Sequence, residues 1–201
     1  MKEFKKKLQT YLSTIDYPGL SVKRSGNTLK ISKSGEKNFC SEISIVYLTR
    51  VSGYYLQVHV KGGELHDAIS EMNLPTSANQ LLCQGVYFHS SLSEKNKQFS
   101  PDIGGARLLY PNCDEASICE DTIDRIKRNN LPLIHSVLYL TKDLPNHVLE
   151  YTADFSYPLG ILAYLQKRGI DETFTRATSD PALRKKFKKE HQIDYKKLLE
   201  I

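Results

Sequence analysis

Between residues 20 and 60 the chain alternates apolar and polar residues in four short runs, and this pattern constrains the fold more than any other feature of the sequence. Alternation with a period of two is typical of strands that bury one face. The connections between the runs are short, whereas parallel pairing requires a long crossover. The sequence therefore predicts an antiparallel meander. Its inward-facing residues are expected to be Leu20, Val22, Leu29, Ile31, Ile43, Ile45, Tyr47, Leu56, Val58 and Val60.

An amphipathic helix is predicted over residues 3–15, directly before the strands. Apolar residues recur there at helical spacing, and Lys5, Lys6 and Lys7 lie largely off the apolar stripe. The stripe consists of Phe4, Leu8, Tyr11, Leu12 and Ile15. We expect this helix to pack on the apolar face of the sheet. The predicted fold class is α+β, with an antiparallel meander packed on an N-terminal helix and a mostly helical C-terminal half.

The rest of the chain predicts one further pair of strands and a series of helices. Asn112 is expected to cap a helix over residues 112–129, and residues 131–140 fit either a helix or a strand. The other expected elements are helices at 64–73, 78–83, 157–168, 181–189 and 195–199, strands near 86–89 and 106–110, and a long loop at 90–105. We predict a single domain over residues 1–201, sheet-rich over 1–111 and helix-rich over 112–201.

Composition indicates an ordinary folded protein, with 40% hydrophobic and 25% charged residues. The longest apolar stretches, at residues 131–140 and 158–165, are far shorter than the roughly 20 residues of a membrane-spanning helix. The first residues are basic but lack the apolar run of a secretory signal. We therefore expect a soluble protein of the cytoplasm, with reduced cysteines and no membrane partner.

No motif of catalysis or metal binding stands out. Five residues separate Cys113 from Cys119, which is not a zinc-site spacing. His66-Asp67 resembles the dipeptide of HD phosphohydrolases, but no second histidine-bearing helix is evident nearby. We expect no metal and no cofactor, and the sequence favours a non-enzymatic protein. An enzyme with a dispersed site is the third alternative, and its candidates are His59, His66, Cys83 and His89.

Charge is segregated along the chain. Residues 1–37 hold nine Lys or Arg against three Asp or Glu, residues 38–180 hold twelve against seventeen, and residues 181–201 hold seven against three. Basic ends around an acidic middle are typical of a protein that selects a charged macromolecule. One hypothesis is binding of nucleic-acid phosphates, provided that both ends fold onto one side. Its candidate residues are Lys5, Lys6, Lys7, Arg184, Lys185, Lys186, Lys188 and Lys189.

The acidic half of the 112–129 helix supports the opposite hypothesis, a basic protein partner. Its carboxylates would attract such a partner and speed association, although they also complement the helix dipole. The candidate partner-binding residues are Asp114, Glu115, Glu120 and Asp121.

The order of features resembles that of small bacterial α+β proteins that include the immunity proteins of toxin–immunity pairs. These features are a basic amphipathic helix, an antiparallel meander, and a helix that runs into residues 126–133, Ile-Lys-Arg-Asn-Asn-Leu-Pro-Leu. The resemblance covers residues 3–138 and transfers no functional residue. It implies a non-catalytic protein that neutralises a protein partner by binding, which is the leading hypothesis. The oligomeric state is left open.

Overall fold

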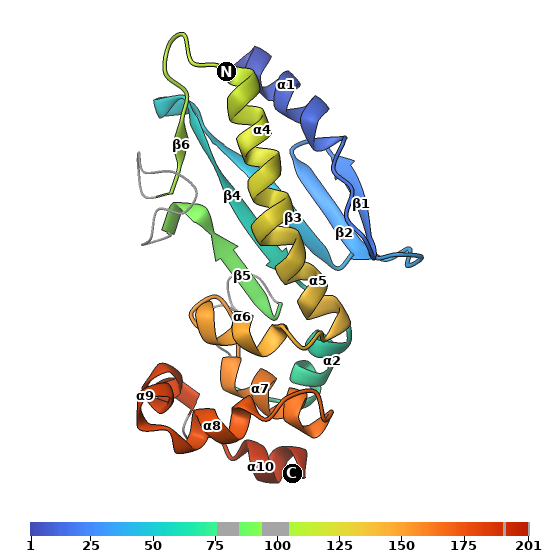
Figure 1. Cartoon of the computed structure of the whole chain (residues 1–201), viewed down its shortest axis with the longest axis vertical. Helices are drawn as coiled ribbons and strands as arrows, with labels where there is room; N and C mark the ends of the chain where they lie inside the picture. Colours follow the sequence, from blue (N-terminus) through green and yellow to red (C-terminus); the bar gives the residue numbers. More distant parts are fainter. Residues whose placement is uncertain (76–84, 94–104, 191, 201) are drawn as a thin grey trace. The chain divides into compact units, whose positions relative to one another are not determined.

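The computed structural model describes residues 1–75, 85–93, 105–190 and 192–200. The chain forms two compact units, each built from two separate stretches (Figure 1). Unit 1 comprises Met1–His59 and His89–Ile134, and unit 2 comprises Val60–Phe88 and His135–Ile201. The grouping of residues 1–201 into one domain stays a prediction, and each unit is described by itself.

The predicted antiparallel meander is confirmed. The strands are β1 (Leu20–Ser25), β2 (Thr28–Lys33), β3 (Ser41–Leu48), β4 (Gly53–Val60), β5 (Tyr87–Ser90) and β6 (Arg107–Leu108). They form one six-stranded sheet in the order β1-β2-β3-β4-β5, with β6 paired to β4. The β1–β2 register places Lys23 opposite Lys30, and the β2–β3 register places Lys30 opposite Glu42.

Two helices cover the same face of this sheet in unit 1, and they contact one another (Figure 1). They are α1 (Lys2–Leu12) and α4 (Glu115–Arg125). Phe4, Leu8 and Leu12, from the apolar stripe of α1, are buried. This is expected of an amphipathic helix that packs its apolar side on the apolar face of a sheet. The ring of Phe4 lies 5.2 Å from that of the fully buried Tyr54 on β4. The predicted packing of the N-terminal helix on the meander is therefore confirmed.

One edge of β4 is completed partly by a side chain. β6 pairs with only the first residues of β4, and the short 3₁₀ helix Ser91–Ser93 lies near the next part of that edge. The backbone N–H of Leu56 donates to Ser91 Oγ at 3.0 Å, and the same hydroxyl donates to the carbonyl of Gly105 at 3.2 Å. Gly105 has φ +92°, and a Cβ there would lie 1.5 Å from the Ser91 carbonyl oxygen. Only glycine fits this close approach.

The helix predicted over residues 112–129 begins later than expected, and Asn112 is not its cap. Asn112 has φ +64° and belongs to the preceding turn. Asp114 is the N-cap instead, because its side chain accepts hydrogen bonds from the backbone of Ala116 and Ser117. After α4 a π-helical turn spans Ile126–Asn130, and it leads directly into α5 (Leu131–Tyr139). Residues 131–139, for which the sequence left a helix and a strand open, are thus a helix.

Unit 2 is helical. Its helices are α2 (Glu64–Glu71), α6 (Leu144–Glu150), α7 (Pro158–Lys167), α8 (Thr173–Ser179), α9 (Pro181–Arg184) and α10 (Tyr195–Leu199), with a 3₁₀ segment at Lys185–Glu190. The seven-residue helices α6 and α8 were not predicted, because neither is long enough to show a clear period. The basic helix predicted at 181–189 is α-helical only over α9, and the chain then continues as the 3₁₀ segment Lys185–Glu190. α7 ends before Gly169 (φ +68°), as predicted.

Some expectations fall on residues outside those that the structure describes. These are the helix predicted at 78–83 and most of the predicted long loop at 90–105. Within the described ranges, no helix combines the length and apolar character needed to span a membrane.

Candidate functional site

The four predicted acidic residues do not act alike. Asp114 caps α4, and Asp121 is drawn into ion pairs within unit 1. Glu120 is exposed and Glu115 is half-buried, and neither forms a hydrogen bond or an ion pair with a described residue. The charges of Glu115 and Glu120 therefore face solvent, whereas that of Asp121 is used internally.

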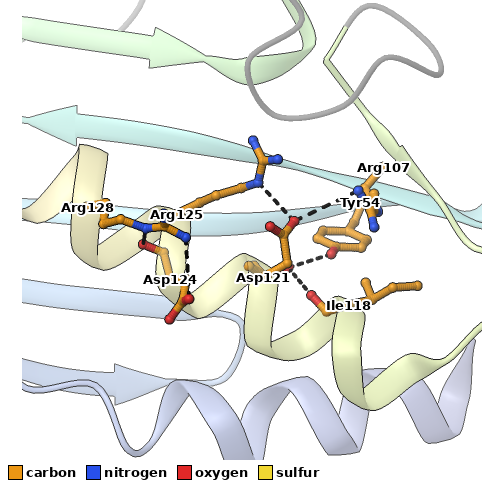
Figure 2. Close-up of polar contacts among 8 residues, drawn as sticks. Tyr54, Arg107, Ile118, Asp121, Asp124, Arg125 and Arg128 are labelled. Atoms are coloured by element: carbon orange, nitrogen blue, oxygen red, sulfur yellow. Dashed lines mark hydrogen bonds and ion pairs between the residues drawn. The ribbon is translucent and has the colours of Figure 1, made fainter.

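The Asp121 cluster joins α4 to the sheet (Figure 2). The Oδ2 atom of Asp121 lies 2.9 Å from Arg125 Nε and 3.9 Å from a terminal nitrogen of Arg107 on β6. Next to it, the Tyr54 hydroxyl and Thr122 Oγ1 are hydrogen-bonded at 2.7 Å. Thr122 Oγ1 donates to the Ile118 carbonyl at 2.7 Å, so the Tyr54 hydroxyl is the donor in its bond to Thr122, and burial raises the pKa of Tyr54 well above its usual range. The cluster positions α4 rather than presenting a free carboxylate.

Two exposed apolar side chains lie at the end of the sheet where α4 begins. Tyr110 is 58% exposed and Val51 is 46% exposed. The backbone N–H of Leu109 donates to the Ser52 carbonyl at 2.8 Å, which brings these two segments together. A turn closed by Cys113 N–H donating to the Tyr110 carbonyl then leads into Asp114. We define the α4 surface as Val51, Tyr110, Asp114, Glu115 and Glu120.

The lysines of α1 are partly engaged within unit 1. Lys5 Nζ lies 4.3 Å from the centre of the Tyr47 ring, a cation–π contact. Lys6 Nζ lies 3.6 Å from a carboxylate oxygen of Glu3, an exposed pair of little energetic value. Lys7 is exposed.

The C-terminal basic residues form a continuous outward surface on unit 2. Phe187 is 1% exposed and Glu190 is 7% exposed, and this spacing of three places both on the inner side of the 3₁₀ segment. The remaining side chains face solvent, and Lys186 Nζ donates to the Leu149 carbonyl at 3.0 Å. We call residues 184–190 the basic segment. Its exposed cations are Arg184, Lys185, Lys186, Lys188 and Lys189.

Glu190 holds the basic segment in place through the N-terminus of α7. Its carboxylate accepts from the backbone N–H groups of Leu159 and Gly160, both at 3.2 Å, and from the Tyr195 hydroxyl at 2.7 Å. A helix N-terminus favours such a negative charge. Burial, followed by the charge of Glu190, raises the pKa of Tyr195 far above its usual range. Sequence reasoning missed this carboxylate, because the residues that bind it at the start of α7 lie about thirty residues earlier in the chain.

Of the residues considered for an enzyme, His59 and His89 belong to unit 1, and His66 belongs to unit 2. His66 Nδ1 lies 3.3 Å from Asp67 Oδ1 at the start of α2, which is a local pair. Burial raises the pKa of Cys119 to about 11, so this thiol is a core residue. Cys83 lies outside the described part of the chain. Among the residues that the structure describes, no group of three or more His, Cys, Asp or Glu is arranged to hold a metal ion.

The two sets of basic residues belong to different units. Lys5, Lys6 and Lys7 lie on α1 of unit 1, and the basic segment belongs to unit 2. Comparison with models of known protein families, with characterised proteins and with solved structures found no match.

Proposed function

We propose that this chain is a non-enzymatic binding protein of the immunity type, which captures a basic protein through the α4 surface. The observation that carries the proposal is the exposed ring of Tyr110 in the turn that leads into the acidic first half of α4. Tyr110 and Val51 supply the apolar contact, and Asp114, Glu115 and Glu120 supply negative charge.

The composition of this surface fits a protein partner. Tyrosine is enriched among the residues that dominate binding energy, because its ring buries a large area and its hydroxyl keeps a hydrogen bond. Carboxylates around such an anchor steer a cationic partner and raise its association rate.

The same surface is held rigidly. α4 is joined to the sheet by the Asp121–Arg107 ion pair and by the Tyr54–Thr122 hydrogen bond, and the turn that the Tyr110 carbonyl closes fixes the backbone of Tyr110. A rigid surface loses little conformational entropy on binding. Asp121 therefore supports the surface without contacting the partner.

The test begins with capture of partners from a nuclease-treated bacterial lysate by the wild-type chain and by the Tyr110→Ala and Phe39→Ala variants. Phe39 is the matched control, because it is a 38% exposed aromatic residue of unit 1 that lies outside the α4 surface. We expect a basic protein to be retained by the wild type and by Phe39→Ala, and to be lost with Tyr110→Ala.

The captured protein is then used for kinetics. Tyr110→Ala should weaken its affinity by about 30-fold, the effect of a hot-spot loss of about 2 kcal/mol. Glu115→Gln with Glu120→Gln should slow association at low salt and leave dissociation nearly unchanged. Equal binding by the wild type and Tyr110→Ala, or a partner that is acidic, would contradict the proposal.

A further inference from the structure

The carboxylates in and beside the basic segment each accept hydrogen bonds from backbone N–H groups of unit 2, and of the three only Glu190 is buried. Asp180 accepts from the backbone N–H groups of Ala182 and Leu183 at the start of α9. Asp194 accepts from the backbone N–H of Lys197 at the start of α10, and Glu190 is bound at the N-terminus of α7. Asp180 and Asp194 remain exposed, so Glu190 is the carboxylate of these three whose charge is withdrawn from the surface.

Three lysines of the same segment face solvent. Lys185, Lys188 and Lys189 are exposed, and their side chains make no hydrogen bond or ion pair with any residue in the described ranges. Residues 180–194 contain five Lys or Arg against three Asp or Glu. Residues 184–190 themselves hold five Lys or Arg and one carboxylate, the buried Glu190, so the exposed charges of the basic segment are all positive.

We infer that the basic segment binds the phosphate backbone of nucleic acid. Lysine ammonium groups are compact, strongly hydrated point charges that bind phosphate without demanding a fixed geometry. Phosphate contacts of this kind position a protein on nucleic acid and carry no sequence information directly. The expected binding is therefore independent of sequence and strongly dependent on salt.

The burial of the segment's apolar residue argues against a membrane surface as the partner. A helix that binds a membrane surface inserts an apolar face among the lipids. Phe187 is the large apolar side chain of the segment, and it is 1% exposed because it packs into unit 2. An acidic protein is also disfavoured, since stable protein interfaces need a buried apolar centre, which this segment does not offer.

The anchoring of the segment preorganises the lysines. Phe187 and Glu190 fix its inner side, and the Lys186 bond to the Leu149 carbonyl fixes a third point. The segment is therefore ordered before it binds, and binding loses little backbone entropy. This surface lies on unit 2 and is independent of the α4 surface on unit 1.

The experiment measures binding of the full chain to a fluorescein-labelled 20-base-pair DNA and a 20-nucleotide RNA by fluorescence anisotropy, at 50 and 200 mM KCl. Each lysine that neutralises a phosphate of B-DNA contributes about −0.9 to the slope of log K against log salt. Three lysines therefore weaken binding roughly 40-fold between the two salt concentrations. The Lys185→Gln, Lys188→Gln, Lys189→Gln triple variant should show a slope that is shallower by about 2.7 and weaker binding at 50 mM salt.

The control is the Lys5→Gln, Lys6→Gln, Lys7→Gln triple variant, which removes the same charge from unit 1. We expect it to retain the wild-type dependence on salt at the basic segment. Circular dichroism establishes that both variants are folded. The inference is overturned by the absence of binding at 50 mM salt, by equal loss in both triple variants, or by preferential binding to vesicles containing phosphatidylserine. Loss of the protein partner of the α4 surface would leave the inference untouched, so the two proposals fail separately.

Discussion

Gly160 sits where helix propensity and the packing of α7 make opposite predictions. It occupies the first turn of α7, where replacement by alanine normally stabilises a helix by about 1 kcal/mol. A Cβ at this position would lie 2.8 Å from Cε1 of the Tyr195 ring, 3.0 Å from Cζ and 3.1 Å from the hydroxyl oxygen. The ring is 2% exposed, and its hydroxyl is bonded to Glu190, so it has little room to move.

Gly160→Ala should therefore destabilise the protein. Overpacking of a buried ring costs about 1–3 kcal/mol, and a weakened hydrogen bond to a charged group costs about 1.5–3 kcal/mol. After the gain in helix propensity, the expected net loss is about 1.5–5 kcal/mol in the free energy of unfolding.

The assay is urea denaturation followed by circular dichroism, applied to the wild type, Gly160→Ala, Tyr195→Ala and the double variant. Tyr195→Ala is destabilising by itself because it leaves a cavity. In that background the added methyl group meets no ring, so Gly160→Ala should become neutral or stabilising by up to about 1 kcal/mol. The change of sign isolates the steric contact from general effects on the helix.

Stabilisation by Gly160→Ala in the wild-type background would refute this reasoning. So would the same destabilisation in both backgrounds, because it would show that the Tyr195 ring is not what limits this position. A changed denaturant slope without a changed midpoint would indicate an altered unfolded state instead.

The remaining predictions concern buried polar groups of unit 1. Tyr54→Phe removes the 2.7 Å bond to Thr122 and should lower the free energy of unfolding by about 1 kcal/mol in urea denaturation, whereas an unchanged midpoint would show that this bond adds nothing. Burial raises the pKa of Tyr47 to about 12, so above pH 10 the unfolded chain loses the Tyr47 proton before the folded protein does. The stabilisation that Tyr47 provides should therefore be complete below pH 10 and fall as the pH rises toward 12, measured by absorbance at 295 nm and by urea denaturation. A Tyr47→Phe variant should lose the part of this pH dependence that Tyr47 causes. Cys119 should resist a thiol reagent at pH 7.5 while the half-buried Cys113 reacts, and mass spectrometry of the labelled peptides checks the order, which equal labelling would contradict.

The meander and the N-terminal helix could be predicted because their signals are local. Alternation at residues 20–60 and the spacing of Phe4, Leu8 and Leu12 depend only on neighbours in the chain. The cap of α4 was harder, because Asn112 and Asp114 are both capping residues two positions apart. Backbone geometry decides between them, since Asn112 adopts a left-handed conformation in the preceding turn.

The helix at residues 131–139 was ambiguous because the periodicity of residues 131–140 does not separate a helix from a strand, and Pro132 in that stretch counts against a helix interior. Proline lacks the N–H that an α-helix needs in its interior. In the structure a π-turn precedes it, and the Leu131 N–H donates to the carbonyl of Ile126 five residues earlier. This adjustment depends on the preceding helix, so the apolar run alone could not indicate it.

The candidate sites depend on contacts between residues that are distant in the sequence, so the charge pattern of the sequence predicted only some of the residues that form them. The exposure of Glu120 and of the lysines at 185, 188 and 189 matches the prediction from charge. The internal use of Asp121 depends on Arg107, which lies in another strand. The anchoring of Glu190 depends on Leu159 and Gly160, about thirty residues earlier, and no local pattern indicates such a pairing.

The interleaving of the two units has a consequence for the nascent chain on the ribosome. α2 is complete at Glu71, but α7, on which it packs in unit 2, begins only at Pro158, with 86 residues between them. At about 5–20 residues per second, translation of that interval takes about 4–17 s. For this time Leu65 and Ile69 lack the helix that later buries them. The first stretch of unit 2 is therefore the part of this protein most in need of a chaperone during synthesis.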